Sequence, residues 1–199
     1  MEYSAGFTKE KWSENELSVV IPMLKEGQTK KEIFDKVADG NLFQLKSFIA
    51  VKNRFNMVYR RAASLDDELQ VVFMNGTDFD KKALTLLTFL SVYRIPLEFY
   101  YEVILHKFSK GEPLYKVDYY DFFETKANQD STVESWRPET VNRLIRTLST
   151  FYTESALLKK VANNQYEITP IHLSQSLKDY AKDHEPLLYS FSQLEKGDQ

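Results

Sequence analysis

Apolar residues in this chain recur at steps of three and four positions, the spacing that lines side chains along one face of an α-helix. The clearest stripes lie within residues 17–24, 33–37, 48–62 and 141–152. Only six glycines and six prolines are spread over 199 residues, which leaves little material for long loops. The sequence therefore predicts a mainly α-helical protein.

Several stripes are preceded by residues that cap helix starts. Thr29 and Glu32 have the spacing of a capping box, in which each side chain accepts a hydrogen bond from the other residue's backbone N–H, and Ser13 and Glu16 repeat it. Ser47 stands where it can cap a long helix that follows it. Each stripe is thus expected to form its own helix with a defined first turn.

Residues 41–64 carry five basic residues and no acidic residue, although the whole protein has a net charge of −3. If the apolar stripe of this helix faces the core, Asn53, Arg54, Arg60 and Arg61 fall on the far side. Arg and Asn can form paired hydrogen bonds with guanine and adenine edges, and further positive charge can meet phosphates. The alternative interpretation is a cationic face that is merely solvated.

A short helix over residues 29–40, a glycine-containing turn and the longer basic helix follow the order of a helix-turn-helix unit. Two helices joined by a turn occur in many α-helical proteins, so the order alone is not specific. The outward Arg and Asn side chains are what favour DNA binding.

A second basic face is expected near the C-terminus. Pro138 should open a long helix that places Arg143, Arg146, Thr147 and Thr150 opposite its apolar stripe. Two short runs with β character, residues 157–161 and 166–169, follow and are joined by a polar turn. A helix followed by a small hairpin is the arrangement of a winged helix. Lys159 and Lys160 would lie on the wing.

These patterns predict three units within a mainly α fold. They are an N-terminal helix-turn-helix lobe (residues 1–63), a central helical core (64–116), and a C-terminal winged-helix lobe with a small β-hairpin (117–199). The most apolar run, residues 83–93, is about half the ~20 residues that a membrane-spanning helix needs. The polar N-terminus lacks the apolar core of a signal peptide. We expect a cytoplasmic protein.

No residue pattern points to an enzyme. The sequence has no glycine-rich phosphate loop and no serine-hydrolase or zinc-protease motif. It has no cysteine, and its three histidines are scattered without metal-ligand spacing. Acidic pairs such as Asp66–Asp67 fit helix caps and first turns. We expect no catalytic residue, no metal, no cofactor and no small-molecule substrate.

Three stretches of the sequence resemble a known family. They are YSAGFTKEKW near the start, LKEGQTKKEIFDKVADGNLFQLKSFIAVKNR in the first third and WRPETVNRLIRTLSTFYTESALL near the end. In this order and at similar chain length they are similar to the BrxA family of bacteriophage exclusion (BREX) systems. The similarity covers nearly the whole chain, and its motifs are loose patterns of apolar and basic positions.

The resemblance implies a small cytosolic accessory protein of a phage-defence operon. Members of the family look like double-stranded DNA binders built from helix-turn-helix and winged-helix lobes around a helical core. A comparison with an RNA-binding antitermination factor of all-helical fold is also attached to the family. This chain departs from the family pattern in being acidic overall, which opposes attraction to phosphate at long range.

The resulting hypothesis is non-enzymatic binding of double-stranded DNA through both lobes. Helical geometry, not the resemblance, selects the expected contact residues, which are Lys52, Asn53, Arg54, Arg60, Arg61, Arg143, Arg146, Lys159 and Lys160. If about six of them reach phosphates, log K should fall against log salt with a slope near −5. The hypothesis requires that Arg54, Arg60 and Arg61 are neither paired with carboxylates nor covered by another helix.

Two alternatives stay open. The first is RNA binding of the antitermination kind. The second is a protein-only adaptor that docks on other BREX proteins through its winged lobes and aromatic surface.

Overall fold

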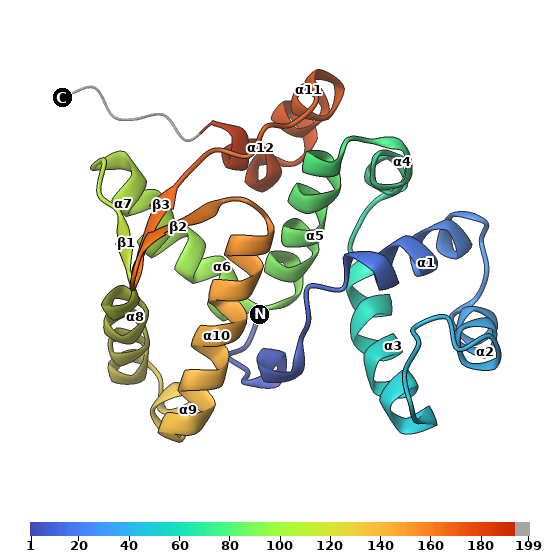
Figure 1. Ribbon diagram of the computed structural model, residues 1–199, viewed down its shortest axis with the longest axis horizontal. Coiled ribbons are helices and arrows are strands. Elements are labelled where there is room, and N and C mark those ends of the chain that lie inside the picture. The colour runs from blue at the N-terminus through green and yellow to red at the C-terminus, as the bar shows by residue number, and fades with distance from the viewer. Residues whose placement is uncertain (194–199) are drawn as a thin grey trace.

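The computed structural model describes residues 1–193, and its fold is mainly α-helical. The N-terminal part contains a short 3₁₀ helix and three α-helices. Their bounds are η1 (Gly6–Lys9), α1 (Glu14–Lys25), α2 (Lys30–Asp39) and α3 (Phe48–Ala62). Helix α3 packs against α1, α2 and α5 (Asp78–Val92), so it is enclosed on several sides. In Figure 1, α1, α2 and α3 lie on the right of the molecule.

Two of the three helix caps that the sequence predicts in this region are present in the structure. The Thr29 side chain and Glu32 form the expected capping box at α2, and Ser47 caps α3 by accepting from the backbone N–H of Ala50. The prediction for Ser13 is wrong. Ser13 has φ = 60° and makes no capping hydrogen bond, and its hydroxyl accepts from Arg54 instead.

The middle of the chain forms a helical layer around α5. This helix is buried along most of its length, and its first turn is closed by a capping box of Thr77 and Asp80. The other elements are α4 (Asp67–Asn75), α6 (Arg94–Phe99), the π-helical segment η2 (Tyr100–Leu105) and α7 (His106–Ser109). Residues 1–13 run between this layer, α3 and α10 (Pro138–Glu154), as Figure 1 shows.

The C-terminal part combines helices with a small sheet. Its elements are β1 (Leu114–Tyr115), α8 (Lys116–Gln129), α9 (Ser131–Glu134), α10 (Pro138–Glu154), β2 (Leu158–Ala162) and β3 (Gln165–Ile168). The strands are antiparallel in the order β1-β3-β2, with a register irregularity between Lys160 and Ala162. Pro138 opens α10 as expected. The predicted hairpin is confirmed, and β1 adds a strand that the sequence did not indicate.

Two last helices return to the central layer. They are α11 (Gln175–His184) and α12 (Pro186–Ser192). Helix α12 packs on α5, the Tyr100 and Ser190 hydroxyls share a hydrogen bond of 2.7 Å, and Ile171 donates its backbone N–H to the carbonyl of Phe191. The C-terminal segment is therefore part of the core packing.

The buried apolar side chains of all these elements form one continuous core. The prediction of a mainly α fold with a small hairpin is confirmed, whereas the division into three lobes at residues 63 and 116 stays a prediction. Strand β1 pairs with β3 across the second of those positions. Within residues 1–193, no helix is both long and apolar enough to cross a membrane.

Candidate nucleic-acid interface

The arginines of α3 do not form the outward basic face that the sequence predicted. Arg61 is fully buried, because α3 is covered on that side by α5, the N-terminal segment and α10. Its guanidinium donates to the carbonyls of Lys11 and Thr85, each at 3.0 Å, and to the Thr88 hydroxyl at 3.1 Å. The prediction that Arg61 points outward from α3 is wrong.

Arg61 belongs to a buried polar cluster centred on Glu10. The Glu10 carboxylate lies 3.7 Å from Arg61 and 3.6 Å from Arg60, and it accepts a hydrogen bond of 2.5 Å from the Tyr93 hydroxyl. Burial lowers the pKa of Arg61 to about 10 in spite of Glu10, so the guanidinium is still protonated at neutral pH. Burial, with the charge and hydrogen bond of Glu10, raises the pKa of Tyr93.

Arg54 and Arg60 are also engaged. Arg54 forms an ion pair of 3.0 Å with Glu16, in which the two side chains are only 17% and 19% exposed. Arg60 is about half exposed (51%), stacks its guanidinium over the Tyr93 ring and donates a hydrogen bond to the Tyr93 hydroxyl. The condition set for the α3 arginines is therefore not met. Helical periodicity placed them opposite the stripe, but the opposite side of α3 is also packed.

The N-terminal half of α3 keeps exposed polar groups. Lys52, Asn53 and Asn56 are exposed, and Lys52 has no ion-pair partner within residues 1–193. Two large apolar side chains lie beside them, since Phe48 is 62% and Ile49 is 72% exposed. This end of α3 is thus a mixed polar and apolar surface.

The predicted basic face of α10 is present. Arg143 and Arg146 are exposed, and neither takes part in an ion pair within residues 1–193. Arg146 lies back along the helix and donates its Nε–H to the Asn142 carbonyl at 3.3 Å. The Asn142 amide in turn accepts from the Tyr120 hydroxyl of α8 at 3.0 Å. Thr150 is exposed as expected, but Thr147 is buried.

The two lysines of the hairpin lie on opposite faces of the sheet. Side chains alternate along a strand, so Lys159 and Lys160 point to different sides. Lys160 is paired in register with Tyr166, whose hydroxyl lies 3.5 Å from Ser149 of α10. Lys159 is paired with Glu167 on the other face. The structure therefore places Lys160 on the α10 side and Lys159 away from it.

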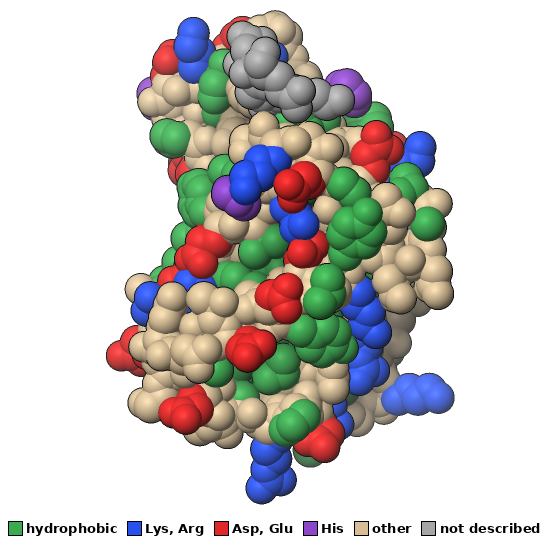
Figure 2. Space-filling view, turned by 90° about the vertical axis from the view of Figure 1, so that its left-hand side faces the viewer, with side chains coloured by type: hydrophobic (Ala, Val, Ile, Leu, Met, Phe, Trp, Pro, Cys, Tyr) green, Lys and Arg blue, Asp and Glu red, His purple; other side chains and the backbone are tan. Residues whose placement is uncertain are grey.

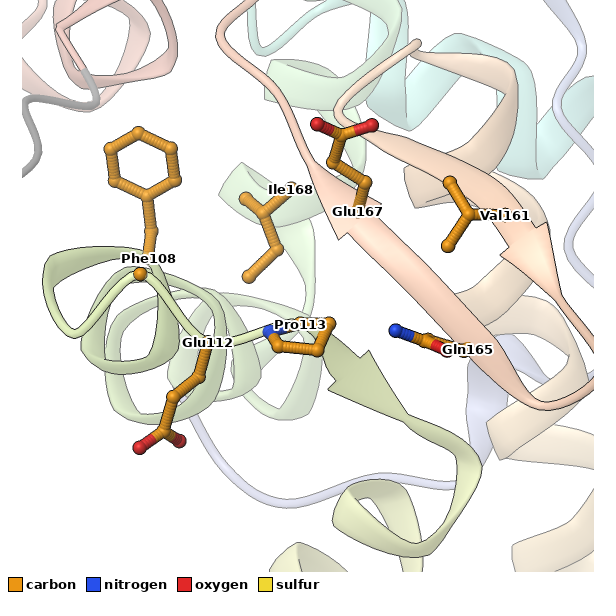
Figure 3. A pocket seen from close by; sticks show the side chains of 8 residues that line it. Phe108, Glu112, Pro113, Val161, Gln165, Glu167 and Ile168 are labelled. Atoms are coloured by element: carbon orange, nitrogen blue, oxygen red, sulfur yellow. The ribbon is translucent and has the colours of Figure 1, made fainter.

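The cavity on the face opposite α10 has no basic lining. A cavity of about 250 Å³ there is bounded by α7, the segment before β1 and the hairpin, and Figure 3 shows Phe108, Pro113, Val161 and Glu167 around it. Its lining includes two glutamates and no cation. On the adjoining surface in Figure 2, acidic, basic and apolar side chains are intermingled. Neither feature suits a polyanion. Within residues 1–193 there is also no group of acidic and histidine side chains with the geometry of a metal site.

Comparison with known proteins gives the family. The model of the BrxA family matches residues 1–185. This chain belongs to the BrxA family. Membership implies that the protein is a component of a BREX phage-defence system, as the sequence resemblance suggested. No curated protein matches the chain.

One solved structure supports the fold. The chain is similar to the crystal structure of an uncharacterized protein from Magnetospirillum magneticum, with a TM-score of 0.81 and 15% sequence identity. The match covers 98% of this chain and 100% of the other. At 15% identity the similarity establishes the fold alone and gives no information about a ligand.

Proposed function

We propose that this BrxA-family protein binds double-stranded DNA without catalysing a reaction on it, and that α10 is the principal contact element. The observation that carries the proposal is the exposure of Arg143 and Arg146 on one face of α10, free of any ion pair within residues 1–193. Exposed arginines on a long helix can contact both base edges and phosphates.

The surrounding topology supports a winged-helix interpretation of this region. Helix α7, strand β1, helices α8, α9 and α10 and the β2–β3 hairpin follow one another, and the sheet order is β1-β3-β2. The hairpin leaves directly from the C-terminal end of α10 and packs against it through Tyr166. In this interpretation α10 enters a groove of the DNA, and Lys160 on the wing meets the adjacent backbone.

The N-terminal lobe has a smaller part in this proposal. Lys52 and Asn53 can contribute one phosphate contact and one polar contact from the start of α3. Arg54, Arg60 and Arg61 hold α3 against the rest of the protein and are not contact residues.

The test is the affinity of purified variants for a short fluorescent DNA duplex, measured by anisotropy. Replacing Arg143 and Arg146 together by Ala should weaken binding by at least about tenfold, because two contacts of charged side chains to DNA are lost. Lys182→Ala, which removes an exposed lysine from α11, is the matched control and should bind normally. Equal affinities of the arginine variant and the control would refute the proposed interface.

Competition identifies the nucleic acid. An excess of unlabelled duplex should displace the probe, and structured RNA at the same concentration should not. Displacement by RNA at equal or lower concentration would favour the antitermination-like alternative.

A second candidate function is favoured by the apolar end of α3. Phe48 and Ile49 are adjacent and largely exposed, and the Phe48 ring packs edge-on against Phe34 of α2, with ring centroids 5.7 Å apart. Clustered apolar surface of this kind marks protein interaction sites more often than DNA contacts. In an adaptor function, these side chains would dock on another BREX protein.

Replacing Phe48 and Ile49 together by Ser should then abolish complex formation with purified BREX proteins while duplex binding persists. Unchanged complexes would exclude this surface as the docking site.

A further inference from the structure

A groove runs between the N-terminal segment and the exposed face of α10. Its volume is about 270 Å³, and it is open to solvent. The lining residues are Thr8, Glu10, Lys11, Trp12, Arg143, Arg146, Thr147, Thr150 and Phe151. The groove is thus lined both by the two arginines of α10 and by residues of the segment 8–12, which the sequence did not indicate as binding residues.

Three cations surround the groove. Lys11 is exposed on the side of the N-terminal segment, facing Arg143 and Arg146 on α10. None of the three takes part in an ion pair within residues 1–193. The Thr147 and Thr150 hydroxyls donate to carbonyls of their own helix, at 3.1 and 2.9 Å. The lysine and the arginines are therefore the donors available to a ligand.

The one carboxylate in the groove does not cancel this charge. The Glu10 side chain is almost fully buried, and it already faces Arg60 at 3.6 Å and Arg61 at 3.7 Å. It also accepts the hydrogen bond of Tyr93. Because Glu10 is balanced from behind by two guanidinium groups, Lys11, Arg143 and Arg146 remain as an uncompensated positive set.

The backbone that carries Lys11 is held in place. The Arg61 guanidinium donates to the Lys11 carbonyl at 3.0 Å, and the adjacent Trp12 ring packs edge-on against Phe151 of α10, with ring centroids 5.4 Å apart. The Lys11 side chain therefore projects from a fixed position beside α10 and not from a loose arm. A preorganised cation loses less freedom when it binds a ligand.

We propose that this groove is a phosphate-binding site formed by Lys11, Arg143 and Arg146. Arginine forks bind phosphate oxygens in pairs, and lysine adds a compact charge opposite them. The phosphate is either an internal phosphodiester of duplex DNA, in which case the inference rests on the proposed function, or a terminal phosphate of a DNA end or nucleotide. In both cases Lys11 is a ligand residue, and Arg61 is the positioning residue that fixes it.

The direct experiment uses inorganic phosphate as the probe. Phosphate is titrated into isotope-labelled full-length protein at constant ionic strength, with chloride as the control anion, and the NMR signals of the Arg143 and Arg146 side chains and of the backbone amides of residues 8–12 are followed. We expect saturable shifts confined to these groups. The shifts should disappear in Lys11→Ala, persist in Lys11→Arg and persist in Lys182→Ala. Absence of saturable shifts, or shifts centred elsewhere, would overturn the site.

The Lys11→Ala variant is suited to this test because it keeps the carbonyl that Arg61 binds. Loss of the side chain should therefore leave the fold unchanged, which thermal unfolding checks. In DNA binding, Lys11→Ala should reduce the magnitude of the slope of log K against log salt by about one if the phosphate belongs to the duplex backbone.

The source of the phosphate is separated by two further probes. If the groove takes an internal phosphodiester, covalently closed plasmid should compete as well as linear DNA per site, and 5′-phosphorylated and 5′-hydroxyl duplexes should bind equally. If it takes a terminal phosphate, only the 5′-phosphorylated duplex should bind tightly.

The two proposals can fail separately. If Lys11→Ala changes neither phosphate shifts nor DNA binding, while the Arg143/Arg146 variant loses DNA, the phosphate site is refuted and DNA binding by α10 stands. If the protein binds no duplex but keeps the Lys11-dependent phosphate shifts, the DNA-binding proposal is refuted and the site stands.

Discussion

The carboxylate of Glu10 lies 3.7 Å from the guanidinium of Arg61, and neither side chain has more than 1% of its surface exposed. This pair connects residues that are about fifty positions apart and joins the N-terminal segment to α3. It explains why an arginine in the most basic stretch of the sequence has a structural role. Because the pair is buried, substitution of either residue should lower the free energy of unfolding.

Arg61→Ala should lower the free energy of unfolding by about 3–5 kcal/mol, because it leaves Glu10 buried without its partner. The measurement is urea unfolding followed by circular dichroism at neutral pH. Arg143→Ala is the control, since truncation of an exposed arginine usually changes stability by less than about 0.5 kcal/mol. Similar unfolding midpoints for the two variants would contradict the assignment of Arg61 to the core.

Arg54→Ala should cost about 2 kcal/mol of stability, because it breaks a partly buried hydrogen-bonded pair with Glu16. It should leave duplex affinity unchanged at temperatures where the variant is folded. This outcome separates a structural arginine from a DNA-contacting one. A variant that is as stable as the parent protein but binds DNA more weakly would restore Arg54 to the interface.

The hairpin should bind asymmetrically. Lys160 lies on the face of the sheet that packs on α10. Lys159 lies on the opposite face, beside Glu167. Lys160→Ala should therefore weaken duplex binding and Lys159→Ala should not, although the two substitutions remove the same charge from neighbouring positions. Equal losses in anisotropy titrations would show that only net charge matters and would contradict the proposed orientation of the wing.

Acid should destabilise the fold through Glu98. Burial alone would raise the pKa of Glu98, but hydrogen bonds from Lys126, Arg94 and Tyr3 outweigh it and hold the pKa below its ordinary value of 4.5. A carboxyl whose pKa is lower in the folded state stabilises the fold fully above its unfolded value, and this stabilisation is lost as pH falls through the folded value.

The matching measurement is urea unfolding over a pH series that extends below 4.5, the ordinary pKa of Glu98. The parent protein should lose stability more steeply with acid than Glu98→Gln, which has no proton to gain at this position. Parallel pH profiles for the two proteins would show that Glu98 does not make this contribution.

Local rules predicted the helices well, because the information lies within a few residues. The Thr29–Glu32 box, the Ser47 cap and the start of α10 at Pro138 all depend on neighbours in the chain. Ser13 failed because its hydroxyl is used by Arg54 from a distant helix. Strand β1 was missed because it is two residues long and is defined only by its pairing with β3.

The candidate site was predicted in part for the same reason. Periodicity correctly placed Arg143 and Arg146 on an exposed face, since α10 is covered on one side. It misplaced Arg61, because α3 is packed on more than one side and periodicity does not reveal a second covering layer. Lys11 was missed as well. The only sequence signal for Lys11 was its position in the FTKEKW segment. The groove that it lines forms between parts of the chain that are distant in sequence.

The most direct test of the central claim is the salt dependence of duplex binding by the parent protein and by the variant with Arg143 and Arg146 replaced by Ala. About five phosphate contacts, from Lys11, Lys52, Arg143, Arg146 and Lys160, predict a slope of log K against log salt of about −4.5 for the parent protein. The variant should give a slope that is smaller in magnitude by about two. A parent slope near zero, or identical slopes for the two proteins, would contradict DNA binding through α10.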